Sequence, residues 1–324
     1  MVNILISGYY GFDNIGDESI LRTLVSSLRE HIPDCSLTVL SHNPTSTREK
    51  YGVEAVDRMS PMAILRAVKK CDMLISGGGS LLQDVTSSKS LHYYLSIIRC
   101  AEFFHKKVFI YSQGIGPIDR PGNRRAAAAA LKRADGIVVR DERSASLLEE
   151  IGIARDKVVI TADPVIRMKK PDGDVGAEIL RKAGVSLDGR LTVGWAIRER
   201  DTDSRFVKEL LRSIQMMKDK YNAQSVLIPF HYEEDGEVCR HIAAQLPDDT
   251  AVCLNEKYLS EDMLSIIGNM DLLVGVRLHS LIYAAIMGVP LIGISYDPKC
   301  TAFLNSVGLD KLSTKENFTA ELFM

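Results

Sequence analysis

Two cationic side chains and an imidazole stand close together in the stretch DLLVGVRLHSLIYAAIMGVPLIGISYDPK, which covers residues 271–299. Arg277 and His279 follow one apolar segment of this stretch, and Lys299 follows the next. Arginine and lysine bind carboxylate and phosphate groups, and a histidine that titrates near neutrality can transfer a proton. These residue types predict a site for a small, strongly anionic molecule.

The elements around these residues explain why they would meet. Residues 271–276 and 289–296 read as buried strands, and residues 280–287 read as a helix that Gly288 and Pro290 end. A strand, a helix and a strand of this length form a βαβ unit with parallel strands. Ligands of open α/β sheets bind at the edge where the carboxyl ends of such strands lie.

Two further side chains of the second half extend this group. Arg198 follows the apolar segment LTVGWAI, and His231 follows VLIPF. Both are therefore predicted at the same edge as Arg277 and His279. His231 by itself has a second interpretation, as a residue with a purely structural role.

Glycine-rich and polar segments follow short apolar segments in the first half of the chain. They are GYYGFDNIGDE, GGGSLLQD, SQGIGP and VVRDERS. Glycine-rich turns before a helix expose backbone amides, which can hold a negative group. The residues predicted to face a ligand here are Asn14, Gly16, Asp17, Gly78, Gly79, Ser80, Gln83, Asp84, Gln113 and Arg140.

Each of these predictions has a structural alternative. Asp17 is alternatively the N-cap of the helix that follows it. Arg140 alternatively pairs with a neighbouring carboxylate. The glycine-rich segments, including the one with Gln113, are alternatively tight turns between a strand and a helix.

Strand-like and helix-like segments alternate along the whole chain, which is typical of α/β proteins. The segment DPVIRMKKPDGD interrupts the pattern, and its charges, prolines and glycine predict a hinge. We therefore predict an α/β fold with two Rossmann-like, doubly wound domains that face a cleft. The predicted divisions are residues 1–165, a hinge at 166–174, and residues 175–324. The last seven residues read as the start of a helix, so the second domain is expected to be truncated at its end.

Composition and missing motifs exclude several classes of protein. The net charge of -2 gives no general indication of nucleic-acid binding. No segment approaches the ~20 apolar residues of a membrane span, and no signal peptide is recognisable. The six cysteines form no CxxC pair and predict free thiols in a reducing cytoplasm. No metal-ligand spacing, dinucleotide fingerprint, Walker loop or serine-hydrolase motif appears, so we predict neither a metal nor a cofactor.

Taken in order, GYYGFDNIGDE, GGGSLLQD, SQGIGP, VVRDERS, TADP and the stretch at 271–299 resemble the polysaccharide pyruvyl transferases, and among them the CsaB branch. The resemblance implies a fold similar to the GT-B glycosyltransferases, with the acceptor on the first domain and the donor on the second. It implies phosphoenolpyruvate as a co-substrate and a lipid-pyrophosphate-linked disaccharide as the acceptor. It further implies peripheral contact with the cytoplasmic membrane face, and a ketal, 4,6-linked, on N-acetylmannosamine of a cell-wall polymer that anchors S-layer proteins through SLH domains.

The residues agree with this donor, because phosphoenolpyruvate places a carboxylate and a phosphate on three carbons and needs several cations. We expect Arg277 and Lys299 to neutralise these groups, with Arg198, Arg140 or His231 completing the site. His279 is the expected general acid. Asp17 or Asp84 is expected to accept the proton of the acceptor hydroxyl.

Two other functions stay open on the sequence. A GT-B glycosyltransferase with a nucleotide-sugar donor would use the same fold and an anion site for pyrophosphate. A non-catalytic glycan-binding protein would also be compatible with the fold, although it would not require Arg277, His279 and Lys299 at one edge. A nucleotide donor would additionally need a base slot and a carboxylate for the ribose.

Overall fold

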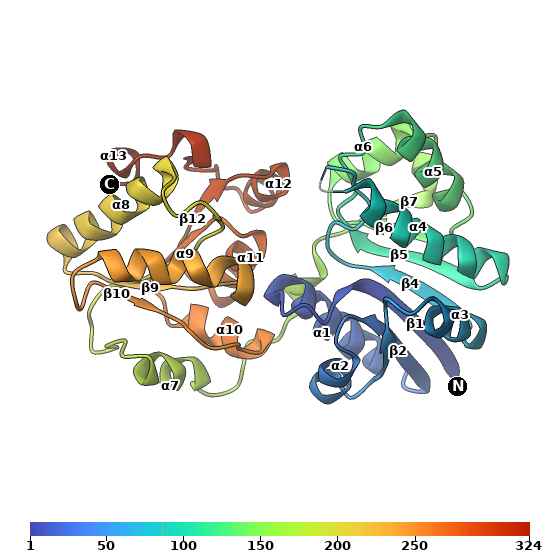
Figure 1. The fold of residues 1–324 in the computed structure, drawn as a ribbon, viewed down its shortest axis with the longest axis horizontal. Coiled ribbons are helices and arrows are strands. Elements are labelled where there is room, and N and C mark those ends of the chain that lie inside the picture. Colours follow the sequence, from blue (N-terminus) through green and yellow to red (C-terminus); the bar gives the residue numbers. More distant parts are fainter. Residues whose placement is uncertain (86) are drawn as a thin grey trace. The chain divides into compact units, whose positions relative to one another are not determined.

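The computed structural model describes residues 1–85 and 87–324 and divides the chain into two compact units, Met1–Arg167 and Met168–Met324. We call them the N-terminal unit and the C-terminal unit. The division falls within the segment 166–174, where the sequence predicts a hinge. Figure 1 shows that each unit is built from a sheet and surrounding helices.

The N-terminal unit contains, within its described residues, a seven-stranded sheet in the order β3-β2-β1-β4-β5-β6-β7. All neighbouring strands are parallel. The strands are β1 (Val2–Tyr10), β2 (Cys35–Ser41), β3 (Glu54–Asp57), β4 (Met73–Gly77), β5 (Lys107–Gln113), β6 (Gly136–Val139) and β7 (Val158–Ile160). The helices are α1 (Ile15–His31), α2 (Pro44–Tyr51), α3 (Pro61–Lys70), α4 (Ser88–Phe103), α5 (Pro121–Leu131) and α6 (Glu142–Glu150).

Both faces of this sheet are covered, as β1 illustrates. Leu5 points into the core that α3, α4, α5 and α6 share with the sheet. Its neighbours Ile4 and Ile6 point into a second core, to which α1 contributes Leu21 and Leu24. Successive side chains of a strand point to opposite faces, so the apolar run of β1 requires helices on both sides. The doubly wound arrangement predicted from the alternating pattern is confirmed for this unit.

The alanine run in α5 is packed, although it lacks large apolar side chains. Ala127 and Ala130 are completely buried in the core shared with α4. Arg99 of α4 donates a hydrogen bond to the carbonyl of Ala126 at 3.3 Å. Small side chains let α5 and α4 approach closely. The alanines of α5 are therefore buried even though the run has no large apolar side chains.

The C-terminal unit contains, in the part of the chain that is described, a six-stranded parallel sheet in the order β10-β9-β8-β11-β12-β13. The strands are β8 (Thr192–Ala196), β9 (Gln224–Leu227), β10 (Ala251–Cys253), β11 (Leu272–Gly275), β12 (Leu291–Ser295) and β13 (Ser313–Thr314). The helices are α7 (Val175–Lys182), α8 (Arg205–Tyr221), α9 (Tyr232–Gln245), α10 (Ser260–Gly268), α11 (Leu278–Met287), α12 (Pro298–Ser306) and α13 (Ala320–Phe323).

Several helix boundaries differ from the sequence prediction. Asp174, predicted in the hinge, is the N-cap of α7. Helix α10 has Leu259 as its N-cap. Helix α11 begins at Leu278, so Arg277 is its N-cap and His279 lies in its first turn instead of in a loop. Polar caps and charged first turns interrupt apolar periodicity, and this is why periodicity alone places helix starts too late.

The last residues pack against their own unit. Phe318 is completely buried, and its ring lies 5.5 Å from that of Phe206 in an edge-to-face arrangement. The amide of Ala320 donates a hydrogen bond to Glu209 of α8 at 2.9 Å. The short helix α13 is therefore an integral part of the C-terminal core.

Candidate active site

The predicted donor residues of the second half gather at one edge of the C-terminal sheet. Arg198 follows β8, His231 follows β9, Arg277 follows β11 and Lys299 follows β12. These strands are parallel neighbours, so their carboxyl ends share an edge. The βαβ topology predicted from the sequence is confirmed, with β11 pairing parallel to β12 around α11.

Arg277 is held by a carboxylate that the sequence analysis did not select. Its Nε donates to Oδ2 of Asp235 at 3.0 Å, and its Nη2 donates to Oδ1 of the same carboxylate. The Asp235 side chain is only 1% exposed, and that of Arg277 is 11% exposed. Burial alone would lower the pKa of the Arg277 guanidinium, but the Asp235 carboxylate outweighs it and raises that pKa. Arg277 is therefore a fixed cation whose Nε–Nη2 edge is already occupied.

Asp235 also fixes the backbone at the end of β9. The amide of His231 donates to its Oδ2 at 2.9 Å. His231 is the N-cap of α9, and its Nδ1 accepts a hydrogen bond from the amide of Glu234 at 3.2 Å. Nδ1 of His231 therefore has a structural role, because it caps α9. In the neutral ring the proton is on the other nitrogen, Nε2.

Glu234 brings a second carboxylate among the cations. It lies 2.9 Å from Nη2 of Arg200 and 3.6 Å from Nη2 of Arg277. Partial burial works to raise the pKa of its carboxyl, but His231 and the arginines Arg200, Arg277 and Arg198 together hold that pKa below its usual value. This edge is thus a mixed network and not a bare ring of cations.

The remaining cations lie on the side of β8 and β12. The guanidinium of Arg198 lies 4.7 Å from the centre of the Tyr296 ring, which follows β12. Nζ of Lys299 lies 3.4 Å from Oδ2 of Asp297, the N-cap of α12. His279 is half-buried in the first turn of α11, with its Nε2 inaccessible to solvent. The structure thus brings the five predicted residues to one edge and adds Arg200, Glu234, Asp235 and Tyr296 to them.

The sequence did carry a signal for the two carboxylates. The segment HYEED places three acids in the first turn after a capping residue, where they favour the positive end of the helix dipole. If these acids are taken as the first turn of a helix that begins after His231, Asp235 lies at the carboxyl edge of the sheet.

In the N-terminal unit, Asn14 and not Asp17 caps α1. The Oδ1 of Asn14 accepts from the amides of Gly16 at 3.1 Å and Asp17 at 3.3 Å. The alternative role of Asp17 as N-cap is therefore wrong, and the predicted ligand residues Asn14 and Gly16 serve to start the helix. The Asp17 side chain lies against the second glycine-rich segment, since a methyl group added to Gly79 would be 2.7 Å from its Oδ1.

Gly78 occupies a position that no other residue fits. Its φ is +78°, and a Cβ there would lie 2.1 Å from Cγ2 of Ile20. L-residues rarely adopt such a backbone conformation. The tight-turn interpretation therefore holds for Gly78, and the turn presses the β4 loop against α1.

Asp84 has a structural position, and its role as a proton acceptor stays a prediction. It accepts hydrogen bonds from the amides of Asp119 at 2.9 Å and Arg120 at 3.1 Å, and from the side chain of Asn123 at 2.8 Å. Burial works to raise the pKa of this carboxyl, but these donors hold it below its usual value. Asp84 is 7% exposed and fixes the chain at the start of α5.

Gln113 is engaged within the N-terminal unit. Its side chain is completely buried, and its Nε2 donates to the Ser76 carbonyl at 2.8 Å and to Oγ of Ser76 at 3.0 Å. The Oε1 of Gln83 accepts from the amide of Val85 at 2.8 Å. The turn interpretation describes both residues better than the prediction that they face an acceptor.

Arg140 ties three segments of the N-terminal unit together. Its Nη1 donates to Asp163 at 2.8 Å, and its Nη2 donates to Oγ of Ser80 at 3.0 Å. The Arg140 side chain is 5% exposed. The alternative prediction for Arg140, that it pairs with a carboxylate, is confirmed, and the carboxylate is that of Asp163. Ser80, predicted to face a ligand, accepts a hydrogen bond from Arg140.

Comparison with known proteins identifies the family. The chain matches the family described as polysaccharide pyruvyl transferase over residues 14–298. The chain belongs to this family. The match extends over most of the chain and includes the edge that carries Arg277 and His279.

A relative and several solved structures agree with this assignment at different levels. The amylovoran biosynthesis protein AmsJ of Erwinia amylovora is 21% identical over 370 residues, covering 97% of this chain and 88% of AmsJ. This pyruvyl transferase is therefore an enzyme related to polysaccharide biosynthesis proteins. The resemblance to the family that the sequence motifs indicated is confirmed.

The solved structures establish the fold. A UDP-GlcNAc 2-epimerase from Methanocaldococcus jannaschii is 14% identical with a TM-score of 0.67, covering 99% of this chain and 90% of the epimerase. Anabaena HepE, solved with UDP and glucose, is 12% identical with a TM-score of 0.60, covering 91% of this chain and 81% of HepE. The pyruvyl transferase thus has the α/β, GT-B-like fold that was predicted.

Two features of the described residues bear on partners. No helix in the described part of the chain combines the length and apolar character that a membrane span requires. Among residues 1–85 and 87–324, no three His, Cys, Asp or Glu side chains are grouped so that they could hold a metal ion. All six cysteines are free thiols.

Proposed function

We propose that this enzyme transfers pyruvate from phosphoenolpyruvate, as a ketal, to a sugar of a lipid-linked cell-wall glycan precursor. The observation that supports the donor is the group of Arg198, Arg277, His279 and Lys299 at the carboxyl edge of the C-terminal sheet. A carboxylate and a phosphate on three carbons need several cations within a short span. The family assignment supplies the transferred group.

Arg277 is the proposed primary anchor of the donor. Asp235 occupies the Nε–Nη2 edge of its guanidinium and fixes the plane of the fork. We assign the remaining edge, at Nη1, to an oxygen of the donor. Lys299 and Arg198 supply further positive charge, while Glu234 excludes a second anion from the Arg200 side of the network.

His279 is the proposed general acid. The reaction begins when its imidazolium gives a proton to the methylene carbon of phosphoenolpyruvate, which leaves an electrophilic C2. One sugar hydroxyl adds to C2, the C2–O bond to phosphate breaks, and a second hydroxyl of the same sugar adds to close the ketal. Inorganic phosphate and one ketal ring are the products. Two hydroxyl protons are released. One returns to the imidazole of His279 and restores its imidazolium, and the other is taken up by Asp17, the proposed acceptor since Asp84 is engaged by α5, and leaves with the phosphate.

The acceptor is proposed in more detail from the family resemblance. It is N-acetylmannosamine in a lipid-pyrophosphate-linked disaccharide, with the ketal across its 4- and 6-hydroxyls, as in the CsaB branch. The product then becomes part of the polymer that SLH domains of S-layer proteins recognise.

The experiment is incubation of the full chain with phosphoenolpyruvate and a synthetic lipid-pyrophosphate ManNAc–GlcNAc acceptor, read by mass. A gain of one pyruvate minus water, with release of phosphate, is the expected result. Acceptors with the two amino sugars exchanged or with a blocked 4-hydroxyl serve as controls. A protein that is stabilised against heat by UDP and not by phosphoenolpyruvate would overturn the proposal in favour of a nucleotide-sugar glycosyltransferase.

Arg277→Ala and Arg181→Ala form the matched pair for the donor site, because Arg181 is an exposed arginine at the end of α7. Phosphoenolpyruvate affinity should fall at least tenfold in the first and stay unchanged in the second. Equal affinity in both would remove the donor from this sheet edge.

A further inference from the structure

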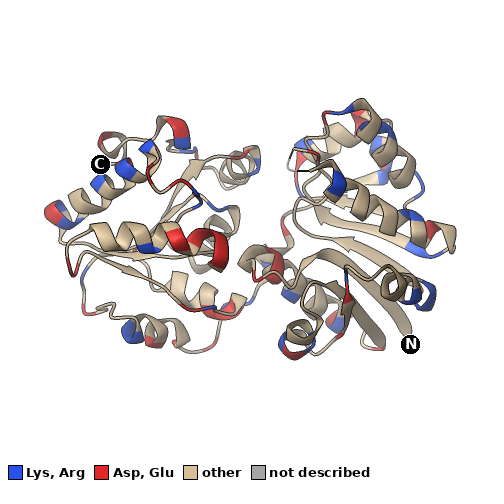
Figure 2. Cartoon of the chain, viewed as in Figure 1, with Lys and Arg blue, Asp and Glu red and all other residues tan. Residues whose placement is uncertain are grey.

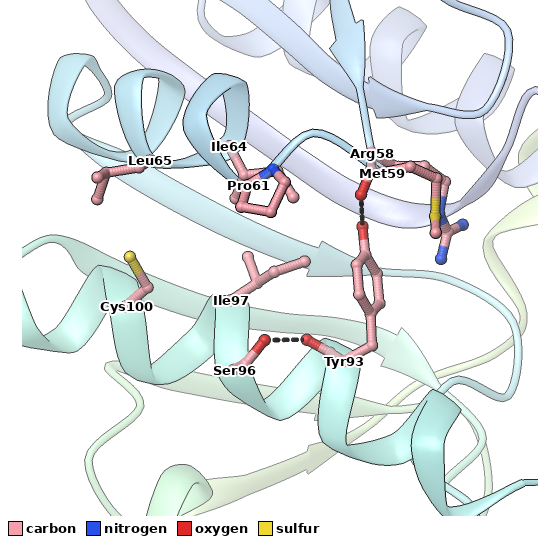
Figure 3. A pocket seen from close by; sticks show the side chains of 9 residues that line it. All are labelled: Arg58, Met59, Pro61, Ile64, Leu65, Tyr93, Ser96, Ile97 and Cys100. Carbon is pink, nitrogen blue, oxygen red and sulfur yellow. Dashed lines mark hydrogen bonds between the residues drawn. The ribbon is translucent and has the colours of Figure 1, made fainter.

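A groove of about 390 Å³ lies between α3 and α4 of the N-terminal unit, away from the residues considered for chemistry. Figure 3 shows Ile64 and Leu65 of α3 facing Ile97 and Cys100 of α4 across it. One end is closed by Tyr93, whose hydroxyl donates to the Arg58 carbonyl at 2.9 Å. The walls are mainly apolar, and the volume is in the range of known small-molecule and lipid sites.

Large apolar side chains stand exposed beside this groove. Met59, which lines the groove, is 68% exposed, and Met62, which follows the lining residue Pro61, is 58% exposed. Phe103, at the last turn of α4, is 76% exposed. Exposed apolar residues that gather next to a groove mark interaction surfaces more often than isolated ones do. Methionine side chains adapt readily to irregular partners.

The same face is positively charged. Helix α3 carries Arg66, Lys69 and Lys70, all exposed, and its sequence PMAILRAVKK contains no acidic residue. Lys69 also places its Nζ 5.1 Å from the centre of the Phe104 ring, and Nζ of Lys106 donates to the Lys69 carbonyl at 2.9 Å. Figure 2 shows this basic colouring of α3. The whole chain has a net charge of -2, so the charge of this face is a local feature.

Two carboxylates, Asp57 and Asp72, stand before and after α3 in the chain. Asp57 accepts a hydrogen bond from the Met59 amide at 2.8 Å. Asp72 accepts from the amide and the side chain of Asn3 at 2.8 Å and 3.2 Å. Both stay charged, but the three cations of α3 outnumber them, so the balance of charge at this helix is positive.

We propose that the α3–α4 face, defined by Met59, Met62, Arg66, Lys70 and the groove between the helices, docks on an anionic lipid bilayer. The apolar side of α3 packs against its own unit through Val68 and Ile64. The proposed contact is therefore made by the exposed Met59 and Met62 together with the cations beside them, which can reach acyl chains and headgroups at the same time. Met59 and Met62 enter the acyl region, the groove receives an acyl chain, and the cations contact headgroup phosphates. The occupant is chosen by charge complementarity, since an uncharged partner would gain nothing from Arg66, Lys69 and Lys70.

This inference deepens the proposed function and rests on it, because a lipid-linked acceptor is the reason for the enzyme to bind a membrane. The surface itself is tested without any substrate. The experiment is flotation of the full chain with vesicles of phosphatidylglycerol and phosphatidylcholine in equal amounts, and with vesicles of phosphatidylcholine alone. The chain should float with the anionic vesicles, and binding should weaken strongly when salt is raised to about 1 M, where the screening length falls to about 3 Å.

Two variants and two matched controls locate the surface. Arg66→Glu/Lys70→Glu should lose at least tenfold in vesicle affinity, because each basic side chain near an anionic surface contributes roughly fivefold. Met59→Ser/Met62→Ser should also bind more weakly, at unchanged salt dependence. Arg181→Glu/Lys182→Glu on α7 and Val307→Ser/Leu309→Ser, which change exposed residues of the C-terminal unit, should bind as the unchanged chain does.

Circular dichroism and thermal melting establish that each variant is folded. The proposal is overturned if the unchanged chain fails to float with anionic vesicles, if it binds neutral vesicles equally well, or if the α7 variant loses as much affinity as the α3 variant. Pyruvyl transfer to a water-soluble disaccharide acceptor, measured in parallel, separates the two proposals. Transfer without vesicle binding would sink the docking surface alone, and vesicle binding without transfer to any acceptor would sink the proposed function alone.

Discussion

Arg277 and Asp235 form a buried, two-point ion pair at the carboxyl edge of the C-terminal sheet, with Nε 3.0 Å from Oδ2. The arginine follows β11 and the aspartate lies in the first turn of α9, so the pair joins two neighbouring βα connections. A buried carboxylate that engages one edge of a guanidinium fixes the direction of its other edge. The pair is therefore the feature that converts a flexible cation into an oriented one.

Asp235→Asn is predicted to raise the KM for phosphoenolpyruvate about tenfold or more while changing kcat less. The amide keeps the shape of the side chain but loses the charge that orients Arg277. Steady-state kinetics against phosphoenolpyruvate measures the effect, and Glu233→Gln, an exposed residue of the same helical turn, is the control. A loss of folded protein with an unchanged KM would show that Asp235 only stabilises the fold.

His279→Gln and His279→Ala are predicted to lower kcat by about 10²- to 10⁴-fold, which is the usual contribution of a general acid. Affinity for phosphoenolpyruvate should change much less, because the cations that hold it remain. Single-turnover kinetics with purified acceptor measures the chemical step, and His92→Gln, an exposed histidine of α4, is the matched control. Near-normal turnover in both His279 variants would assign the proton to another group.

Asp84→Asn is predicted to lower stability without changing the chemical step. Loss of the charge weakens three hydrogen bonds, at a cost of about 2 kcal/mol, which corresponds to roughly 4–8 °C in Tm for a unit of this size. The pKa of the Asp84 carboxyl is lower in the folded protein than in the unfolded chain. Its stabilising contribution is therefore complete above the unfolded pKa of about 3.9 and is lost as the pH falls through the lower folded pKa.

The measurement for Asp84 is thermal melting of the unchanged chain and the variant across this pH range. The difference in Tm should be full at neutral pH and should shrink at strongly acidic pH. A turnover defect at neutral pH, in protein that is fully folded at the assay temperature, would restore Asp84 as a candidate proton acceptor.

Gly78→Ala is predicted to destabilise the N-terminal unit more than Gly184→Ala destabilises the C-terminal unit. Both glycines have positive φ, +78° and +89°, but a Cβ at Gly78 would meet Ile20 at 2.1 Å, whereas nothing described lies within 4 Å at Gly184. The backbone strain is common to both, and the overpacking of roughly 1–3 kcal/mol applies to Gly78 alone. Urea unfolding of each variant measures the difference, and equal losses would show that Ile20 moves aside without cost.

The sequence by itself determined the fold class and the place of the donor residues. Apolar runs of strand length alternate with amphipathic helices, and parallel strands must carry their carboxyl ends to one edge. This is why the sequence alone places Arg198, His231, Arg277 and Lys299 together. The motifs also indicated the family that the comparison then identified.

Tertiary structure alone decided what each side chain contacts. Asp235 and Arg277 are 42 positions apart, and no local pattern reports which carboxylate turns toward which guanidinium. In the same way, the sequence allows Asp84 to be a base, and only the structure shows that it accepts hydrogen bonds from the amides at the start of α5. Strand edges follow from periodicity, which is local, whereas hydrogen-bond partners depend on loop paths that bring distant residues within about 3 Å.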